Sequence, residues 1–359
     1  MTDRRTLLKG LAAAAILPVR GWAAVGSPNW VAAARLPDGR YVLHGIDVAG
    51  TLTFTVPLPD RGHAAAAHPF RAEVVAFARR PGTFGLVIDC RDGAITRHLT
   101  PPMGRQFNGH GVFSGDGTRL YTSEVVAEGS AGRIGVWDVS AGYVRLDEWD
   151  SHGLGPHEVR LLPDGNVVVA NGGIQTDPED RTPLNLDRME PNLVVLDPGG
   201  VLLSRRELPP DLAQNSIRHL ALLSDGIAFA MQWQGDMADQ VPLLGMAKGN
   251  DPLSVHPPGE ADGFAMKGYA GSVAATADGK VAITSPRGGV VMIHDGQGRH
   301  LATMSRADIC GAAALDTDRF ALTDGSGAIW AADTEGLSLI AHHNLSWDNH
   351  LVRVSAVLP

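Results

Sequence analysis

Short apolar runs, separated by glycine, proline and aspartate, follow one another along the chain from about residue 30 onward. Val74 to Ala78, Val167 to Ala170 and Val290 to His294 are typical, and valine is the commonest residue in them. Runs of this length, rich in β-branched residues and bounded by turn formers, predict strands. After the N-terminal region, no stretch of twelve or more residues keeps helical spacing together with capping residues. The pattern therefore predicts an all-β protein.

The strands form a repeated unit. Gly155-Pro156-His157-Glu158 opens one copy, which continues as a strand to Leu162 and turns at Asp164-Gly165 into a second strand. Other copies share this opening, and the copy beginning near His110 continues through four short strands. A repeat of about 40 to 60 residues with four strands is the signature of a β-propeller blade.

Seven openings recur at spacings of 39 to 62 residues: His63, His110, His157, His219, Ser272, Gly311 and His350. His350 begins a strand with no blade behind it. The N-terminal segment supplies three strands without an opening strand, at 30–36, 41–46 and 51–58. Joining the two ends removes exposed sheet edges, which favour aggregation. We therefore predict a seven-bladed β-propeller, its ring closed by the C-terminal strand joining the N-terminal blade.

Two connections, 172–214 and 234–268, are longer than the others. The first is rich in aspartate and proline and holds one clear strand, Leu193 to Leu196. Long connections in a ring of short turns are usually functional, so we expect these two to fold over one face.

The N-terminal residues predict an export signal, with an ordinary N-terminal helix as the alternative. Arg4 and Arg5 precede Thr6-Leu7-Leu8-Lys9 and a short apolar run, which is the pattern of a twin-arginine signal. Residues 1–23 are predicted to be this signal and residues 24–359 the propeller, located in the periplasm. The apolar run is too short to span a bilayer, which takes roughly twenty residues.

Charge and cysteine usage narrow the partners. After removal of residues 1–23 the chain has 26 basic and 38 acidic residues. This acidic balance argues against nucleic acid and anionic membrane surfaces. The two cysteines, Cys90 and Cys310, match no CxxC pattern and lie on distant repeats, so we expect two free thiols.

The chain resembles a family of exported bacterial propellers, domain of unknown function 1513 (DUF1513), of the YVTN and quinoprotein-like propeller superfamily. The motifs that carry the resemblance are 109–114 (GHGVFS), 155–158 (GPHE), 171–174 (NGGI), 184–187 (LNLD), 216–220 (SIRHL), 232–233 (QW) and 284–289 (TSPRGG). The resemblance implies a periplasmic protein encoded near imelysin-like proteins associated with iron uptake. It implies no activity and no catalytic residues.

Five repeats place a histidine at the opening of the strand that lines the channel of a propeller. Neutral imidazole is the commonest protein ligand for transition metals, and mixed histidine and carboxylate suits iron, copper or zinc. The candidate metal ligands here are His63, His110, His157, Glu158, His219 and His350, with Ser272 and Cys310 at the remaining openings.

The register of these strands limits the prediction. His110 and His219 lie six residues before the turn aspartate of their repeat, whereas His157 lies seven before Asp164. Because strand side chains alternate, a shift of one residue turns a group away from the channel. We expect three of the five histidines to converge, and either His157 or Glu158 to face the channel. The alternative is a wet channel in which the histidines bind backbone and water.

A second group of polar residues stands where the next strand of each repeat ends. Glu124 is a candidate metal ligand or general base. Arg79, Asn171, Gln232 and Arg287 are candidates for binding a small ligand, the arginines through a carboxylate. The alternative for each is a polar residue that closes a turn.

The sequence favours a periplasmic binding or accessory protein for iron or copper, held at a histidine-rich channel mouth, with a periplasmic protein of imelysin-like type as a possible partner. A metal-dependent oxidoreductase or hydrolase with its site in the same channel is the alternative. A docking scaffold without site chemistry is the third interpretation.

Overall fold

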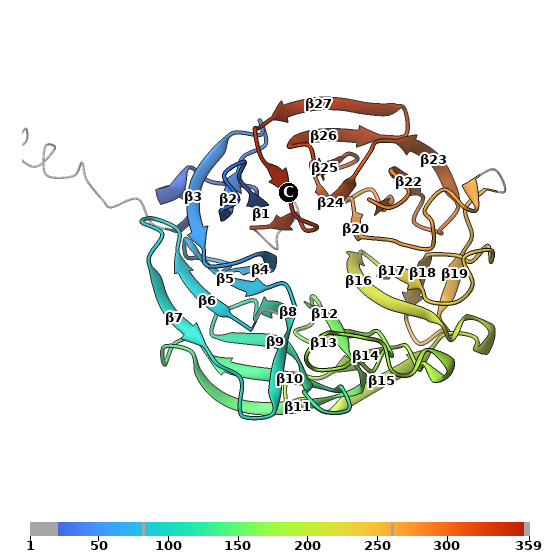
Figure 1. Cartoon of the computed structure of the whole chain (residues 1–359), viewed down its shortest axis with the longest axis horizontal. Helices are drawn as coiled ribbons and strands as arrows, with labels where there is room; N and C mark the ends of the chain where they lie inside the picture. The colour runs from blue at the N-terminus through green and yellow to red at the C-terminus, as the bar shows by residue number, and fades with distance from the viewer. Residues whose placement is uncertain (1–20, 81–82, 260–261, 355–359) are drawn as a thin grey trace, which may run out of the picture.

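The computed structural model describes residues 21–80, 83–259 and 262–354. These residues form seven antiparallel sheets arranged around one axis, as Figure 1 shows. The predicted seven-bladed β-propeller is therefore confirmed. The three helices of the described residues are short 3₁₀ turns, η1 (Gly21–Val25), η2 (Leu186–Arg188) and η3 (Pro210–Leu212).

Blade 1 combines both ends of the chain, and blades 2 to 7 follow in sequence order. Blade 1 contains β1 (Trp30–Arg35), β2 (Tyr41–Ile46), β3 (Leu52–Leu58), β28 (Ser346–Trp347) and β29 (Val352–Arg353). Blade 2 contains β4 (Gly62–Ala67), β5 (Glu73–Ala78), β6 (Gly85–Asp89) and β7 (Ile95–Leu99). Blade 3 contains β8 (Arg105–Phe113), β9 (Arg119–Val126), β10 (Ala131–Asp138) and β11 (Val144–Leu154). Blade 4 contains β12 (Pro156–Leu161), β13 (Val167–Asn171), β14 (Asn192–Leu196) and β15 (Leu202–Glu207).

The other three blades have the same four-stranded order. Blade 5 contains β16 (Asn215–Leu223), β17 (Gly226–Trp233), β18 (Leu244–Lys248) and β19 (Ser254–His256). Blade 6 contains β20 (Ser272–Ala275), β21 (Val281–Ser285), β22 (Val290–His294) and β23 (His300–Ser305). Blade 7 contains β24 (Ile309–Ala314), β25 (Phe320–Asp324), β26 (Ala328–Asp333) and β27 (Gly336–His342). In each of these blades the first strand lies nearest the central axis (Figure 1).

The core lies between the blades, because each blade buries both of its faces. Successive residues of β13 alternate between two interfaces: Val167 and Val169 pack against blade 3, whereas Val168 and Ala170 pack against blade 5. All four are fully buried. The continuous apolar run at this position is therefore a strand buried on both faces, as its sequence suggests.

The ring closes through the C-terminal segment, which Figure 1 shows beside the N-terminal strands. β28 and β29 both pair antiparallel with β1, matching Trp347 to Ala34 and Val352 to Val31. The predicted closure agrees with this pairing, but the inner edge is two short strands rather than one strand starting at His350. Trp30 of β1 also donates a hydrogen bond from Nε1 to the carbonyl of Ala314 in blade 7, at 3.3 Å.

The two long connections contain more structure than their sequences indicate. The first holds β15 as well as the predicted strand, and the second holds β18 and β19. The prediction of one strand in 172–214 was wrong, because β15 is mostly exposed and reads Leu-Leu-Ser-Arg-Arg-Glu, without a buried apolar face. The longest connection between successive strands that the structure describes without a gap is 172–191.

None of the helices in the described residues is long and apolar enough to cross a membrane. The predicted twin-arginine motif falls within residues 1–20, outside the described residues. Residues 21–25 form η1, and the indole of Trp22 donates a hydrogen bond to the carbonyl of His68, 2.8 Å away.

Deleting residues 346–359 should abolish the cooperative fold. The deletion removes both strands that pair with β1 and the buried side chains of Trp347 and Leu351, which pack between blades 7 and 1. A loss of several kcal/mol is expected, which is comparable to the whole stability of many domains. Circular dichroism and thermal melting would measure it. A chain ending at Val354 is the control and should melt like the full chain; a cooperative melt of the shorter chain would contradict this closure.

Candidate metal centre in the channel

The innermost strands carry irregularities at the positions of the histidines. The pairing of β4 shifts between Gly62 and Ala65, so His63 lies in a bulge. The pairing of β12 shifts between Pro156 and Glu158, and that of β16 between Ile217 and His219. β8 shows the same shift around His110. A bulge breaks the alternation of side chains and re-aims the residue it contains.

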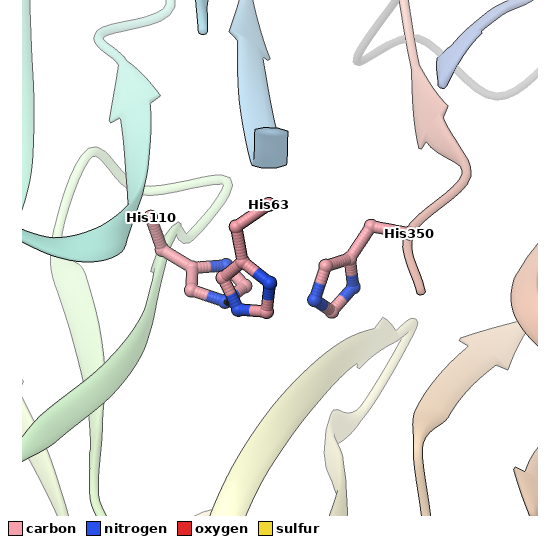
Figure 2. A group of neighbouring side chains, drawn as sticks. All are labelled: His63, His110 and His350. Carbon is pink, nitrogen blue, oxygen red and sulfur yellow. Dashed lines mark hydrogen bonds between the residues drawn. The ribbon is translucent and has the colours of Figure 1, made fainter. Parts of the chain in front are cut away.

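All five histidines converge in the channel, where three were expected. Figure 2 shows the rings of His63, His110 and His350 turned into one space. Neighbouring rings have centroids 4.6 to 4.9 Å apart around the set, in the order His63, His350, His219, His157, His110. We call these five residues the histidine hub. They come from five consecutive blades, 1 to 5.

The hub has two sides. His110, His219 and His350 are buried and line a cavity of about 30 Å³ together with Glu158 and Arg160. His63 and His157 are half-buried and do not line this cavity. By volume the cavity holds one or two water-sized groups.

The hub leaves several ring nitrogens without protein partners. His110 Nε2 lies 3.2 Å from His63 Nε2, so the two rings form a hydrogen bond when one of these nitrogens carries a proton and the other does not. Within the hub, three buried ring nitrogens have no hydrogen-bond partner among the described residues: His63 Nδ1, His157 Nδ1 and His350 Nε2. Buried polar groups are normally satisfied, so such a concentration calls for a ligand or water.

Glu158 lies beside the histidine hub. Both His157 and Glu158 therefore face the channel, where only one of the two was expected to do so. Because His157 occupies the bulge, both residues reach the channel region. Glu158 Oε2 accepts a hydrogen bond from the amide of Leu220 at 2.9 Å and lies 3.3 Å from His219 Nδ1. Its other oxygen pairs with Arg160 at 2.7 Å.

The carboxyl of Glu158 is ionised. Burial alone would raise its pKa, but the charge of Arg160 and the neighbouring His219 more than offset that effect, and the pKa lies well below its usual range. Glu158 therefore supplies one negative charge to the buried side of the hub.

Four of the hub imidazoles are neutral at physiological pH: those of His63, His110, His157 and His350. Burial lowers the pKa of His110 to about 3, and the charges of other groups, including His219 and Arg160, act on it as well. Burial, followed by the neighbouring histidines, also lowers the pKa values of His63, His157 and His350 well below their ordinary value. A neutral imidazole has a lone pair available for a metal ion.

Two groups of three histidines have metal-ligand geometry. His63, His110 and His350 form one, and His110, His157 and His219 form the other. Within each group the ligand nitrogens all lie within 4.8 Å of one another. His110 is common to both groups. Imidazole donors suit zinc, copper, iron and nickel, so the residues fit a transition-metal ion.

Three arginines surround the hub; Arg79 was predicted as a site residue, whereas Arg160 and Arg218 were missed by the sequence analysis. The charge of Arg79 lowers the pKa of His63, the charge of Arg218 that of His157, and the charge of Arg160 that of His350. Arg218 directly precedes His219, inside the bulge of β16. Because a bulge interrupts the alternation of side chains, the adjacent residues Arg218 and His219 can both approach the channel. This bulge was not predicted from the sequence.

The other predicted site residues lie apart from the hub or hold local structure. Glu124 is fully buried in blade 3 and pairs with Arg145 at 2.7 Å. Asn171 is satisfied by Ser151 and by Asn192, at 2.8 Å each. Gln232 donates to the carbonyl of Ala270.

Two predicted arginines stand at the channel mouth, the side on which the second strands β5, β13 and β21 end. Arg79 Nη1 is 3.5 Å from Asp348 Oδ1, a carboxylate that also pairs with Arg61. Arg287 is exposed and stacks over Tyr269, with its guanidinium carbon 4.3 Å from the ring centroid.

Both cysteines are free and buried, as expected. Burial raises the pKa of the Cys90 thiol to about 12 and raises that of Cys310 as well. Cys310 lies at the blade 7 position of the channel, but its protonated thiol is a poor metal ligand, because the thiolate is the binding form.

The fold and the hub define a class: a β-propeller whose channel is lined by convergent histidines. The chain belongs to the family described as "Protein of unknown function (DUF1513)", whose model matches residues 56–354. No curated protein matches the chain in sequence.

Solved structures share the propeller fold at low identity. The computationally designed Ika8 protein is 17% identical with a TM-score of 0.56, and the match covers 92% of this chain and 87% of that one. BamB from Moraxella catarrhalis is 13% identical with a TM-score of 0.53, covering 87% and 82%. A protein of unknown function from Bacteroides caccae is 13% identical with a TM-score of 0.50, covering 78% and 94%. These likenesses establish the fold alone.

Metal-free protein should lose stability as the pH falls from 7.5 to 5. The unfolded chain binds protons on its histidines below about pH 6.5, whereas folded His110 does so only near pH 3. Stability is therefore full above pH 6.5 and decreases on acidification, with His110 alone contributing a loss of about 2 kcal/mol at pH 5. Urea unfolding with a chelator present measures it. His110→Gln should reduce the pH dependence by about that amount; an unchanged pH dependence in this variant would contradict the burial of a neutral imidazole.

Proposed function

We propose that this protein is an exported propeller that holds a transition-metal ion, iron or copper, at the histidine hub. The observation that carries the proposal is the convergence of five imidazoles, several of which have buried ring nitrogens without a protein partner among the described residues. A hub built only to fill the channel would be served by apolar side chains, which need no partners.

The nitrogen ligands of the hub favour a transition-metal ion over calcium or magnesium. The hub offers imidazole nitrogens and one nearby carboxylate, whereas calcium and magnesium are held mainly by oxygen ligands. His110 participates in both groups of three, so it is the ligand on which binding depends most.

Holding a metal is favoured over turnover of an organic substrate. The cavity beside the hub measures about 30 Å³, whereas pockets for organic ligands are roughly ten times larger. Glu124, the predicted general base, is committed to Arg145 in blade 3. Metal storage or transfer therefore suits the hub better than the oxidoreductase or hydrolase alternative.

The periplasmic location and an imelysin-like partner belong to the proposal. The Arg4-Arg5 signal supports export by the twin-arginine route, which carries folded proteins and permits metal loading before export. The genomic neighbourhood implied by the DUF1513 family supports iron as the cargo.

His110→Ala should lower the metal content of natively exported protein about tenfold or more, because it removes a ligand from both groups. Elemental analysis of the purified protein by mass spectrometry gives the metal content per chain, and the melting temperature confirms that the variant is folded.

His98→Ala is the matched control, since His98 is an exposed histidine on β7, far from the hub. It should retain wild-type metal content. Equal metal content in folded His110→Ala and His98→Ala proteins would overturn the proposed function.

A further inference from the structure

The loop between β13 and β14, residues 172–191, leaves blade 4 and crosses to blades 3 and 2. Gln106 of blade 3 donates a hydrogen bond to the carbonyl of Pro178 at 3.4 Å. Arg181 donates to the carbonyl of Arg80, just after β5 of blade 2, at 3.0 Å. The loop thereby brings the guanidinium of Arg181 to the channel mouth.

Three arginines gather there without carboxylate partners. We call Arg80, Arg181 and Arg218 the arginine cluster. None of the three lies within 4.0 Å of a carboxylate oxygen among the residues that the structure describes, whereas Arg79, Arg145 and Arg160 all do. Asp177 lines a small cavity beside Arg80 and Arg181, but its Oδ1 accepts the backbone amides of Glu179 and Asp180.

The charges of the arginines in the cluster influence one another's pKa values. Burial, and then the charges of Arg181 and Arg218, lower the pKa of Arg80. Burial and the charge of Arg181 also lower the pKa of Arg218, opposed by Tyr269. All three remain cationic at neutral pH, since guanidinium does not lose its proton in proteins. Like charges held together without a counterion are destabilising, so the cluster is set up for an anion.

The surroundings of the arginine cluster supply further polar groups. Arg218 Nε is buried without a hydrogen-bond partner among the described residues. Gly172 lies against the Arg218 guanidinium, where an added Cβ would sit 3.5 Å from Cζ. Arg80 Nη1 lies 3.4 Å from the hydroxyl of Thr176, and Thr176 is on the same loop as Arg181.

We propose that the arginine cluster binds a multiply charged oxyanion, a polycarboxylate or a phosphate, at the channel mouth beside the histidine hub. Guanidinium groups match the geometry of carboxylate and phosphate oxygens and bind them through two donors at once. Three such groups, from three blades, carry enough positive charge to balance two or more negative charges on one ligand. In a chain of net charge -9, this local concentration of positive charge attracts anions selectively to the mouth.

The site extends beyond the proposed metal function and does not require it. The same anion would also offset the charge of a metal ion in the hub, because the charge of Arg218 reaches His110 and His157. The test therefore uses metal-free protein, so that its outcome is independent of the metal assay.

Calorimetric titration of metal-free mature protein with citrate, and separately with inorganic phosphate, tests the site. Saturable 1:1 binding that weakens with added salt is expected for at least one of the two. Citrate binding alone would assign a polycarboxylate, phosphate binding alone would assign a phosphate, and either result supports the site. Binding of neither anion at millimolar concentration would overturn it.

Arg181→Gln should weaken the affinity about tenfold or more, because it removes a charge-assisted contact. Arg181 is exposed, so the substitution leaves the core intact. Arg188→Gln is the matched control: it removes the same charge from an exposed position of the same loop. It should change the affinity less than twofold. An equal loss of affinity in the two variants would show that the anion responds only to overall positive charge and not to a defined site. That result would overturn the proposal.

His110→Ala distinguishes the two proposals. It should lower metal retention about tenfold or more and leave the affinity for the anion within about twofold of the wild-type value, because His110 is not part of the arginine cluster. Loss of anion binding in folded His110→Ala protein would contradict the separate anion site.

Discussion

The structure depends on bulges in the strands that face the axis. A regular strand sends alternate side chains to opposite faces, and in a propeller both faces pack against neighbouring blades. A bulge at His63, His157 or Arg218 breaks this alternation, so that a polar side chain points along the blade edge into the channel. The β20 strand of blade 6 pairs regularly with its neighbour, and it brings no histidine to the hub.

Burial and charge then determine what the hub can hold. Burial in the channel lowers the pKa values of His63, His110, His157 and His350, which keeps these imidazoles neutral and available as ligands. Glu158 supplies one negative charge, but Arg160 pairs with it. A metal ion in this hub would therefore sit in a positive environment. The unpaired arginine cluster at the mouth provides a place for the compensating anion, which links the two sites electrostatically while leaving them separate in composition.

The repeat pattern was sufficient to predict seven blades and closure by the chain ends, because blade spacing and turn residues are local signals. It was insufficient for β15, whose exposed side chains do not follow a buried pattern. It also failed to choose between His157 and Glu158, since a sequence count assumes strict alternation and a bulge removes it. Arg181 could not be found from the sequence, because it reaches the mouth only through a loop that crosses two blades.

The most direct measurement is anomalous X-ray diffraction from crystals of natively exported protein, collected on either side of the absorption edge of the metal found. The account predicts one strong peak among His63, His110, His157, His219 and His350, about 2.0 to 2.3 Å from at least three of their ring nitrogens. A metal peak elsewhere, or ordered water alone in the hub, would contradict it.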